Sequence, residues 1–414
     1  MKILIDEIGH FSNFEKQINE LISSHYRSIM IFHAEGGIDS EPKYKQMCDK
    51  ALVSTSKNDV NIFGGIFPGI FDNGTLMQKG SILVGIKSDV HVITLENLNN
   101  SDLYNEIEQK LAPISDSLIN EEYKTLFVYG DGFGENNHNL INGLNQLVKK
   151  YPMNVIGELT GRDKIKSSHY TIFTPAKIIQ NGAVLAFTKL ESGIGVQHGW
   201  EPLIDSELEI TKINDCFVEE INGAPALDFY MHIITGQNKE IYHKQEQLLK
   251  DRNAFFSQVA VKYPLGLIRK EKGTKKYIDR TPISVGADKS LQFSAQIPAG
   301  TKTVILHLKG NSPKTQCSNL TQAVKQAYKD CQDSFPDTIK QKRVIIMDCF
   351  GRKNVVESMG KRYSDIEFKD IAEDQKNKVH SPIGPLTIGE ISSMPGNYVE
   401  LHNKTAVVGL IEDN

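Results

Sequence analysis

A chain of 414 residues is long enough for two domains, and its 39% hydrophobic and 24% charged residues are typical of a folded globular protein. The formal net charge of −4, without a basic stripe, argues against nucleic acid as a partner. No run approaches the roughly 20 apolar residues of a membrane span, and the charged beginning MKILIDE does not resemble a signal peptide. We therefore expect a cytoplasmic protein with no membrane partner.

Three stretches of the sequence repeat one order of elements. The first contains SIMIFHAEGGID, NDVNIFGGIFPGI and KGSILVGI, the second KTLFVYGDGFGE, YPMNVIGELTG and NGAVLAFTKL, and the third RVIIMDCFGRKN, SPIGPLTIGEI and NKTAVVGLI. Each predicts a strand, a polar loop with glycine, a helix, a second strand and then hairpin strands. Strand–helix–strand units favour parallel pairing, whereas hairpins add antiparallel strands. We predict an α/β fold of mixed β-sheets flanked by helices, built from repeated strand–helix–strand–hairpin units.

The pattern changes between the second and third units. Residues 180–222 alternate short strands with turns, residues 235–258 predict a polar helix, and residues 270–280 predict a charged turn between two strands. We place the domain boundary after the second unit. This predicts an N-terminal domain of residues 1–192 and a C-terminal domain of residues 193–414.

Glycines recur near the predicted strand ends, as in Gly64–Gly65 and in the two IGE segments that contain Glu158 and Glu390. Glycine at such places allows either a close approach of the backbone to a small ligand or a tight turn. The spacing fits neither a P-loop nor a dinucleotide fingerprint. Two carboxylates act as an acid–base pair only when a cavity brings them together, so Glu158 and Glu390 are candidates on that condition.

The stretch VIIMDCFGRKNVVESMG, residues 344–360, joins a predicted buried strand directly to a helix. Free backbone N–H groups at a helix start attract anions, and the planar guanidinium of Arg352 suits a carboxylate or phosphate. The alternative is that Arg352 pairs with a local carboxylate such as Asp348 or Glu390. The same position favours a lowered pKa for Cys349. Catalysis by that thiol would also need a positioned histidine, and the sequence identifies none.

Three histidines are candidate axial ligands of a haem. His33 follows an apolar run, His198 lies next to the only tryptophan in GVQHGWEP, and His402 lies in YVELHNKT. The alternative for each is a structural side chain with satisfied hydrogen bonds. There is no C-x-x-C-H motif for covalent haem and no H-E-x-x-H metal motif. The five scattered cysteines predict free thiols rather than a disulfide framework or a zinc site.

Taken together, the motifs resemble a known family. GGIFPGIFDNG and GSILVGI resemble the N-terminal half of a FIST domain protein. GAVLAF, GVQHGWEP and VEEINGAPALDFY resemble the beginning of its C-terminal half. KYPLGLI, IPAGTKTVILH, MDCFGRKN, PLTIGEI and ELHNKTAVV then follow in the order of that half. Each motif is weak alone, but their order is specific, and the resemblance covers nearly the whole chain.

The resemblance implies a sensory protein that binds a small ligand such as an amino acid. No output domain is recognised in this chain, so the signal is expected to pass to a separate partner, such as a histidine kinase or a diguanylate cyclase, and assembly as a homodimer is left open. The Cys-x-Gly-Arg and Gly-Glu-Ile turns are expected to converge at one end of a sheet, with Arg352 and Glu390 as an ion pair. Gly64 and Gly65 are expected to form a second ligand-binding site. The ligand-binding residues expected at the convergence are Cys349, Gly351, Arg352, Gly389 and Glu390.

Two alternatives stay open. One branch of the family, which this chain resembles in length, consists of haem proteins that sense nitric oxide. Many relatives have a polar Gly-Cys-Ser-Thr-type turn where this chain has Gly-Gly-Ile-Phe-Pro, and the apolar version suits either a greasy ligand such as haem or simple core packing. A haem sensor with His33, His198 or His402 as its axial ligand is therefore one alternative, although the residues identify no cofactor. An enzyme acting on a small substrate through Cys349 or Glu390 is the other.

Overall fold

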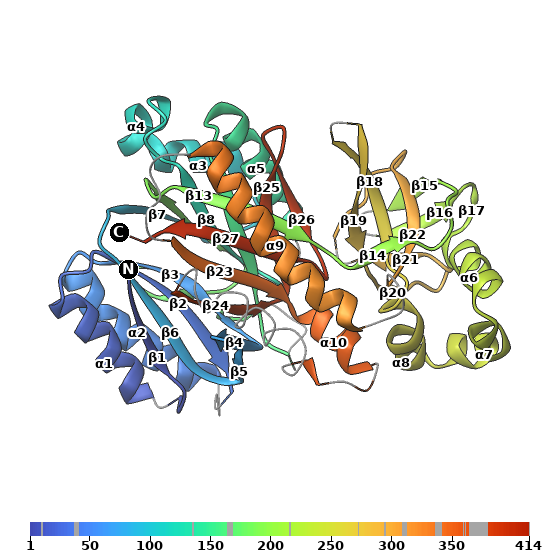
Figure 1. Ribbon diagram of the computed structural model, residues 1–414, viewed down its shortest axis with the longest axis horizontal. Coiled ribbons are helices and arrows are strands. Elements are labelled where there is room, and N and C mark those ends of the chain that lie inside the picture. Colours follow the sequence, from blue (N-terminus) through green and yellow to red (C-terminus); the bar gives the residue numbers. More distant parts are fainter. Residues whose placement is uncertain are drawn as a thin grey trace.

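The computed structural model describes residues 1–413 except residues 10, 37–40, 135, 164–168, 215–216, 272, 294, 309–312, 336–341, 359, 361 and 364–379. The described chain forms a larger lobe of three β-sheets with helices and a smaller lobe that joins it along one side (Figure 1). We call the larger lobe the three-unit core and the smaller lobe, residues 200–308, the inserted domain. No helix in the described part of the chain is long and apolar enough to cross a membrane.

Each unit of the core is built on a six-stranded sheet with the same plan. The strands of the first sheet are, in spatial order, β1 (Lys2–Asp6), β6 (Lys79–Ile86), β2 (Ser28–Glu35), β3 (Asn61–Phe67), β10 (Ile172–Phe173) and β11 (Ile178–Ile179). Those of the second are β7 (Val90–Leu95), β12 (Ala183–Thr188), β8 (Thr125–Asp131), β9 (Asn154–Thr160), β25 (Gly389–Met394) and β26 (Tyr398–His402). Those of the third are β13 (Ser192–Gln197), β27 (Ala406–Glu412), β23 (Lys342–Cys349), β24 (His380–Thr387), β4 (Gly69–Asp72) and β5 (Thr75–Met77).

The hairpin of each unit pairs with a different unit. Hairpin β4–β5 follows the second strand of the first unit but pairs with β24 of the third. Hairpin β10–β11 leaves the second unit and pairs with β3 of the first, and hairpin β25–β26 leaves the third and pairs with β9 of the second. The three units thus exchange hairpins in a cycle, so that each sheet contains strands from two units.

The predicted fold class is confirmed. The pairs β2–β3, β8–β9 and β23–β24 are parallel, and the remaining neighbours in these sheets are antiparallel, so the sheets are mixed. Their inner faces share one hydrophobic core, to which the first sheet contributes Phe32 and Phe63, the second Tyr129, and the third Ile345 and Val407. A shared core of this kind makes the three units one folding body rather than three.

Helices cover the outer faces of the core. In the first two units they are α1 (Phe11–Ser23), α2 (Glu41–Lys57), α3 (Leu103–Leu111), the 3₁₀ turn at Ala112–Ile114, α4 (Ser115–Ile119) and α5 (Asn137–Lys150). In the third they are α9 (Pro313–Ser334) and α10 (Phe350–Ser358). Helix α9 crosses the third sheet diagonally (Figure 1). The face of α5 that carries Leu140, Leu144 and Leu147 is buried, as the helical spacing of these residues predicts.

The inserted domain is an antiparallel sheet with helices at its outer end (Figure 1). Along the sheet lie β19 (Thr274–Arg280), β18 (Leu265–Glu271), β22 (Lys302–Leu308), β15 (Leu208–Asn214), β16 (Phe217–Ile221), β21 (Leu291–Phe293) and β20 (Pro282–Val285), with β14 (Trp200–Pro202) on β22 and β17 (Ala224–Pro225) on β16. The helices are α6 (Ala226–Gln237), α7 (Lys239–Lys250), α8 (Arg252–Phe255) and a π-helical turn at Phe256–Ala260. The predicted charged turn at residues 270–280 is wrong for most of its length, because residues 274–280 form β19, which pairs with β18 as a hairpin.

Candidate functional site

Buried polar side chains gather where the third unit, hairpin β25–β26 and the inserted domain meet. Such groups are rare in a protein interior unless they are paired or bind something. Six segments contribute to them: β9, the end of β19, the β23–α10 junction, Tyr363 after α10, the β24–β25 junction and the turn between β26 and β27. We call the set the buried polar cluster, and its members are Glu158, Asp279, Asp348, Cys349, Arg352, Tyr363, Thr387, Glu390, Lys404 and Thr405.

Glu390 has three hydrogen-bond partners within the buried polar cluster. Its Oε1 accepts a hydrogen bond from the Thr387 hydroxyl, and its Oε2 accepts one from the backbone N–H of Thr405 at 3.3 Å. The Cys349 thiol also donates to this carboxyl group. Burial raises the pKa of Glu390 well above its usual range, and the nearby Asp348 raises it further. The environment therefore favours the neutral acid.

Glu158 lies directly opposite Glu390 across the β9–β25 pair. Burial raises the pKa of Glu158 well above its usual range, and the carboxyl group of Glu390 adds to the effect. Among the described residues, Glu158 Oε2 has no hydrogen-bond partner. The two carboxyl groups thus meet, as an acid–base pair would require. The IGE segments are nevertheless not equivalent, because Gly157 lies inside β9 whereas Gly389 begins β25.

Arg352 is fully buried and contacts Asp348 four residues earlier, with Nε 2.8 Å from Oδ1. The hydroxyl of Tyr363 donates to Asp348 Oδ2. Of the two carboxylates that the sequence offered as partners, the one that this contact joins to Arg352 is therefore Asp348. The strand-to-helix junction places both ends of the pair, since Asp348 closes β23 and Arg352 lies in the first turn of α10.

The pKa of Cys349 is raised, whereas its position at a helix start predicted a lowered pKa. Burial raises the pKa of the thiol well above its usual range, and the adjacent Glu390 raises it further. The neighbouring Gly351 keeps this wall thin, because a Cβ there would lie 3.0 Å from Lys404 Cγ and 3.4 Å from Cys349 Sγ. At Gly389 a Cβ would lie 3.1 Å from a methyl group of Leu159. A side chain at either glycine would therefore crowd the neighbouring side chains of the site.

Asp279 and Lys404 connect the inserted domain to the core. Burial raises the pKa of Asp279 to about 7, although Lys404 opposes the shift. Burial also lowers the pKa of Lys404 to about 8, against the attraction of Asp279. Lys404 Nζ donates to the carbonyl of Val261 at 2.8 Å and lies over the Trp200 ring. Asp279 Oδ2 has no hydrogen-bond partner among the described residues, whereas Oδ1 accepts from Thr405 Oγ1 at 3.5 Å.

The family models match both parts of this chain. The model of the FIST N domain matches residues 41–224, and that of the FIST C domain matches residues 226–393. The chain belongs to the FIST domain family. Members of this family are small-ligand-sensing domains of signalling proteins. A search of curated proteins found no match.

The buried polar cluster of this FIST domain protein draws on both matched regions. Glu158 lies within the FIST N match, and Asp279, Cys349 and Glu390 lie within the FIST C match. Lys404 follows the end of the second match. The two matches meet inside the inserted domain, and the division of the chain at residues 192 and 193 stays a prediction.

Gly64 and Gly65 have a packing role in this FIST domain protein. They lie in β3 of the first sheet, whereas the buried polar cluster lies at the second and third sheets. A Cβ at Gly64 would lie 2.1 Å from the carbonyl oxygen of Ile31, and one at Gly65 would lie 2.2 Å from a methyl group of Thr160. Close approach of neighbouring protein atoms therefore explains both glycines, and a second ligand site there stays a prediction.

The three candidate haem ligands lie in two places. His33 lies in β2, where its ring packs edge-on against Phe14 at 5.8 Å, and burial lowers its pKa to about 4. His198 and His402 both line a cavity of about 860 Å³ between α9 and hairpin β25–β26. Burial lowers their pKa values to about 4 and about 3. All three are therefore neutral at pH 7, which is the form that binds metals.

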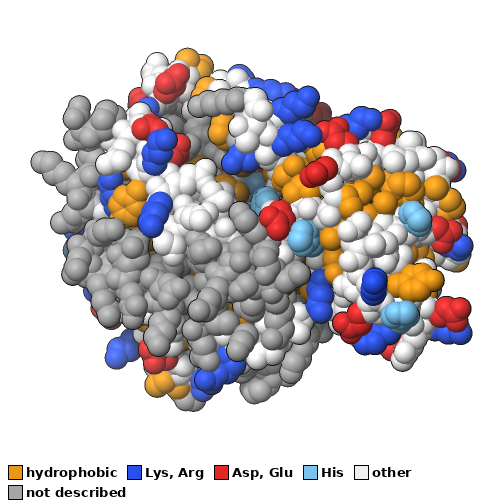
Figure 2. Space-filling view, turned by 45° about the vertical axis from the view of Figure 1, so that its right-hand side comes forward, with side chains coloured by type: hydrophobic (Ala, Val, Ile, Leu, Met, Phe, Trp, Pro, Cys, Tyr) orange, Lys and Arg blue, Asp and Glu red, His pale blue; other side chains and the backbone are white. Residues whose placement is uncertain are grey.

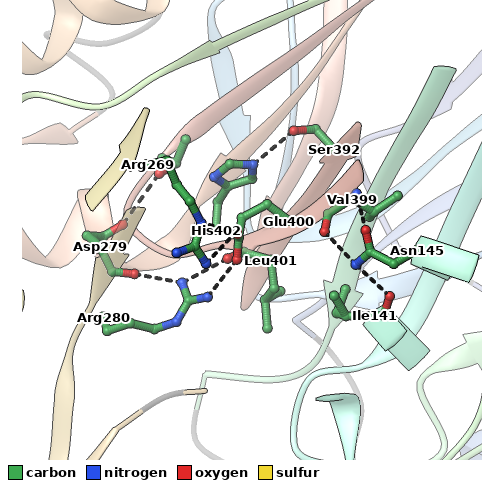
Figure 3. Close-up of polar contacts among 11 residues, drawn as sticks. Ile141, Asn145, Arg269, Asp279, Arg280, Ser392, Val399, Glu400, Leu401 and His402 are labelled. Atoms are coloured by element: carbon green, nitrogen blue, oxygen red, sulfur yellow. Dashed lines mark hydrogen bonds and ion pairs between the residues drawn. The ribbon is translucent and has the colours of Figure 1, made fainter. Parts of the chain in front are cut away.

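The cavity beside His198 and His402 does not fit a haem. His198 Nδ1 accepts the backbone N–H of Trp200 at 3.2 Å, and the imidazole also bonds to the backbone of Tyr277. His402 Nε2 is 2.9 Å from the Ser392 hydroxyl (Figure 3). The wall is rich in polar side chains instead of forming an apolar slot, and these include Asn154, Gln197, Lys276, Gln322, Gln326 and Asp330. Within the described residues, no group of three or more His, Cys, Asp or Glu side chains is placed to hold a metal ion.

Sequence reasoning missed the contribution of the inserted domain to this site. Asp279 and Arg280 lie at the end of the stretch that was predicted to be a charged turn, yet both side chains are buried. Lys404 and Thr405 belong to the ELHNKTAVV motif, which supported the resemblance to the family without indicating a role. The only local signal is an Asp-Arg pair beside apolar residues at the end of a strand.

Proposed function

We propose that this protein is a cytoplasmic small-ligand sensor that signals through a separate partner, such as a histidine kinase or a diguanylate cyclase. We further propose that the ligand binds in the buried polar cluster, where Cys349, Gly351, Arg352, Gly389 and Glu390 come together. Membership of a family of ligand-sensing domains supports the first part. The arrangement of hydrogen bonds in the cluster supports the second.

The observation that carries the proposed site is a pair of buried acceptors. Glu158 Oε2 and Asp279 Oδ2 lie in the buried polar cluster without a hydrogen-bond partner among the described residues. Leaving a buried polar group unsatisfied costs about 1–3 kcal/mol. A small ligand with a hydroxyl group, which both donates and accepts, or with an ammonium group would supply the missing partners. Such a ligand would be retained tightly because the site is closed to water.

The position of the cluster also suggests how binding would be transmitted. Thr405 contacts Asp279, and Lys404 contacts the carbonyl of Val261, so two of the contacts between core and inserted domain pass through the site. A ligand shifts a conformational equilibrium only if its affinity differs between the two states. A ligand in the cluster would touch both lobes and so favours one relative placement of them. The signalling partner would recognise that placement of the two lobes.

The chemistry of the cluster gives little support to the enzyme alternative. A nucleophilic cysteine acts as the thiolate, and burial beside Glu390 holds Cys349 in the thiol form. The neutral carboxyl group of Glu390 is a proton donor, but it lies in a fully buried position. The haem alternative lacks a fitting donor set at His198 and His402, as the bonds of both imidazoles indicate.

Glu390→Gln tests the proposed site. Burial raises the pKa of Glu390, and glutamine, which carries no charge, preserves its volume and one acceptor oxygen while changing the donor pattern toward a ligand. We expect wild-type protein, purified without denaturant and then denatured, to release a small molecule that mass spectrometry identifies. We expect Glu390→Gln to release at least about tenfold less of it, since the loss of one hydrogen bond to a ligand corresponds to about 1.4 kcal/mol.

The matched control is Glu209→Gln, the same change in an exposed Lys302–Glu209 pair of the inserted domain. This variant should release as much ligand as the wild type. Thermal unfolding of all three proteins checks that the fold is retained. Equal ligand content in wild type and Glu390→Gln, or no bound molecule after incubation with cell extract, would rule out the buried polar cluster as the ligand site.

A further inference from the structure

A second hollow lies between the two lobes and is lined by residues of β26. It has a volume of about 560 Å³. The core side is formed by α5, the loop before it and β26, and the inserted-domain side by β18, the end of β19, β20 and β21. Figure 2 views the molecule with the inserted domain brought forward, and side chains of both charges gather along the junction of the lobes. We call this hollow the interlobe cleft.

Two arginines and a single glutamate make the charged part of the interlobe cleft. Arg280 is buried and donates to Glu400 Oε1 at 3.0 Å and to the carbonyl of Leu401 at 2.8 Å. Arg269 reaches the other oxygen of Glu400 only at 3.3–3.4 Å, and its side chain is 35% exposed. Figure 3 shows both guanidinium groups converging on this one carboxylate. Among the described residues that line the cleft, Glu400 is the only acidic one.

The charge of this group is unbalanced. One carboxylate faces two guanidinium groups. The neighbouring acid, Asp279, interacts with the charges of both Lys404 and Arg280, and burial raises its pKa to about 7, so it offsets the charge of Arg280 only in part. Arg280 is buried and donates to Glu400, to Leu401 and to the carbonyl of Asp279, so the positive charge that is accessible to a ligand is that of Arg269. A positive charge in a partly enclosed cleft attracts anions more strongly than one on an open surface. Arginine also offers a planar fork that matches a carboxylate.

The rest of the interlobe cleft is suited to an organic body. Apolar and aromatic side chains from both lobes face it, whereas its amide groups supply a small number of polar contacts, as in many small-molecule sites. Helix α5 is fixed to the cleft floor, because Asn145 exchanges hydrogen bonds of 2.9 and 2.8 Å with the backbone of Val399 (Figure 3). The apolar lining is formed by Phe133, Ile141, Leu267, Ile283, Phe293 and Leu401.

We infer that the interlobe cleft binds a small organic anion, with its carboxylate on Arg269 and its apolar body between the two lobes. This site is separate from the buried polar cluster and does not depend on the function proposed above. It takes a ligand of different chemistry, since the cluster presents two carboxyl oxygens that lack hydrogen-bond partners among the described residues and the cleft presents a cation. An occupant of the cleft would touch α5 and β26 of the core together with β18 and β21 of the inserted domain.

Benzoate is a suitable probe, because benzamide has nearly the same shape without the charge. We expect the full-length protein to bind sodium benzoate saturably in isothermal titration calorimetry and benzamide at least about tenfold more weakly. Inorganic phosphate, an anion without an apolar body, should also bind more weakly than benzoate. Added salt should weaken the binding of benzoate, because Arg269 is partly exposed and exposed charges are screened.

Arg269→Gln should reduce the affinity for benzoate by about tenfold, as expected for loss of one charge-assisted hydrogen bond. The matched control is Lys302→Gln, which removes an exposed cation of the same domain outside the cleft and should leave the affinity unchanged. Gln296→Glu adds a negative charge to the cleft wall and should weaken benzoate but not benzamide. Unfolding midpoints confirm that each variant is folded.

Three results would overturn the inference. These are equal binding of benzoate and benzamide, undiminished benzoate binding in both Arg269→Gln and Gln296→Glu, and no benzoate binding at any accessible concentration. Tighter binding of phosphate than of benzoate would also contradict it, since an inorganic anion would then be the better occupant. None of these results depends on how much ligand Glu390→Gln releases. Each of the two proposals can therefore be rejected without affecting the other.

Discussion

Asp279 and Lys404 face each other in a closed environment, and burial shifts the pKa of each toward its neutral form. The folded-state pKa of Asp279 is about 7, whereas an unfolded aspartate has a pKa of about 3.9. Between these two values the folded protein holds a proton that the unfolded chain has released. The free energy of unfolding therefore falls as the pH rises through this interval. Lys404 acts in the opposite direction above pH 8, because there the unfolded lysine keeps the proton that the folded one releases.

Asp279→Asn should remove the part of this pH dependence that Asp279 causes. Between pH 4 and pH 7 the wild type should lose stability relative to the variant by on the order of 2–4 kcal/mol, because the amide has no proton to release. Chemical denaturation at several pH values measures the difference. Asp228→Asn, in an exposed pair with Lys289, serves as the control and should show a flat difference. Parallel stability curves for wild type and Asp279→Asn would contradict a raised pKa at this position.

At the scale of the element, β13 depends on α9. Strand β13 forms an edge of the third sheet, and the outward N–H groups of Ile194 and Val196 donate to Asp330 and Gln326 of α9 at 2.9 and 3.2 Å. The helix thus satisfies the backbone of an edge strand that would otherwise be open to other chains. Such a close approach requires small residues on the strand. A Cβ at Gly195 would lie 1.8 Å from the carbonyl oxygen of Ala323.

Gly195→Ala should therefore lower the free energy of unfolding by at least about 2 kcal/mol, because the methyl group meets helix backbone that cannot move aside. Gly236→Ala is the matched control. Gly236 lies in α6 with nothing within 4 Å of an added Cβ, so alanine should stabilise the helix by about 0.5–1 kcal/mol. Urea denaturation of the two variants measures both effects. A Gly195→Ala protein as stable as the wild type would mean that α9 does not pack against β13 in this way.

At the scale of the molecule, the exchanged hairpins decide what can fold alone. A chain of residues 1–192 contains the strands of the first two units but lacks β25, which pairs with β9, and β24, which pairs with β4. Both open edges would expose backbone groups and apolar side chains of the shared core. The two parts of the chain are therefore joined by shared β-sheets, whereas independent domains are joined only by a linker.

We expect the fragment of residues 1–192 to show no cooperative unfolding transition by itself, and to fold when it is produced together with residues 193–414. Size-exclusion chromatography and circular dichroism of the separate and combined fragments measure this. The inserted domain carries its own core, so the fragment of residues 200–308 is the internal control and should retain helix and strand signals. A fragment of residues 1–192 that unfolds cooperatively at the wild-type temperature would show that the exchange contributes little to stability.

Local patterns in the sequence were sufficient for much of the fold. The period of apolar residues predicted the strands and helices of the three units, including the buried face of α5, and their order predicted mixed sheets. The pairing of the hairpins was beyond such patterns. A strand sequence shows which of its faces is buried but not which strand lies beside it.

By itself, then, the sequence determined the repeated units and the family. It also indicated residues at the strand ends near Glu390, whose role in ligand binding stays a prediction. Only the tertiary structure decided that Glu158 lies opposite Glu390, that Arg352 contacts Asp348, and that an inserted domain brings Asp279 to Lys404. It also decided the pKa direction of Cys349, which is set by burial and not by the helix start. The physical reason is the same in each case: propensity and periodicity act over a few residues, whereas desolvation and ion pairing depend on neighbours that are distant in the sequence.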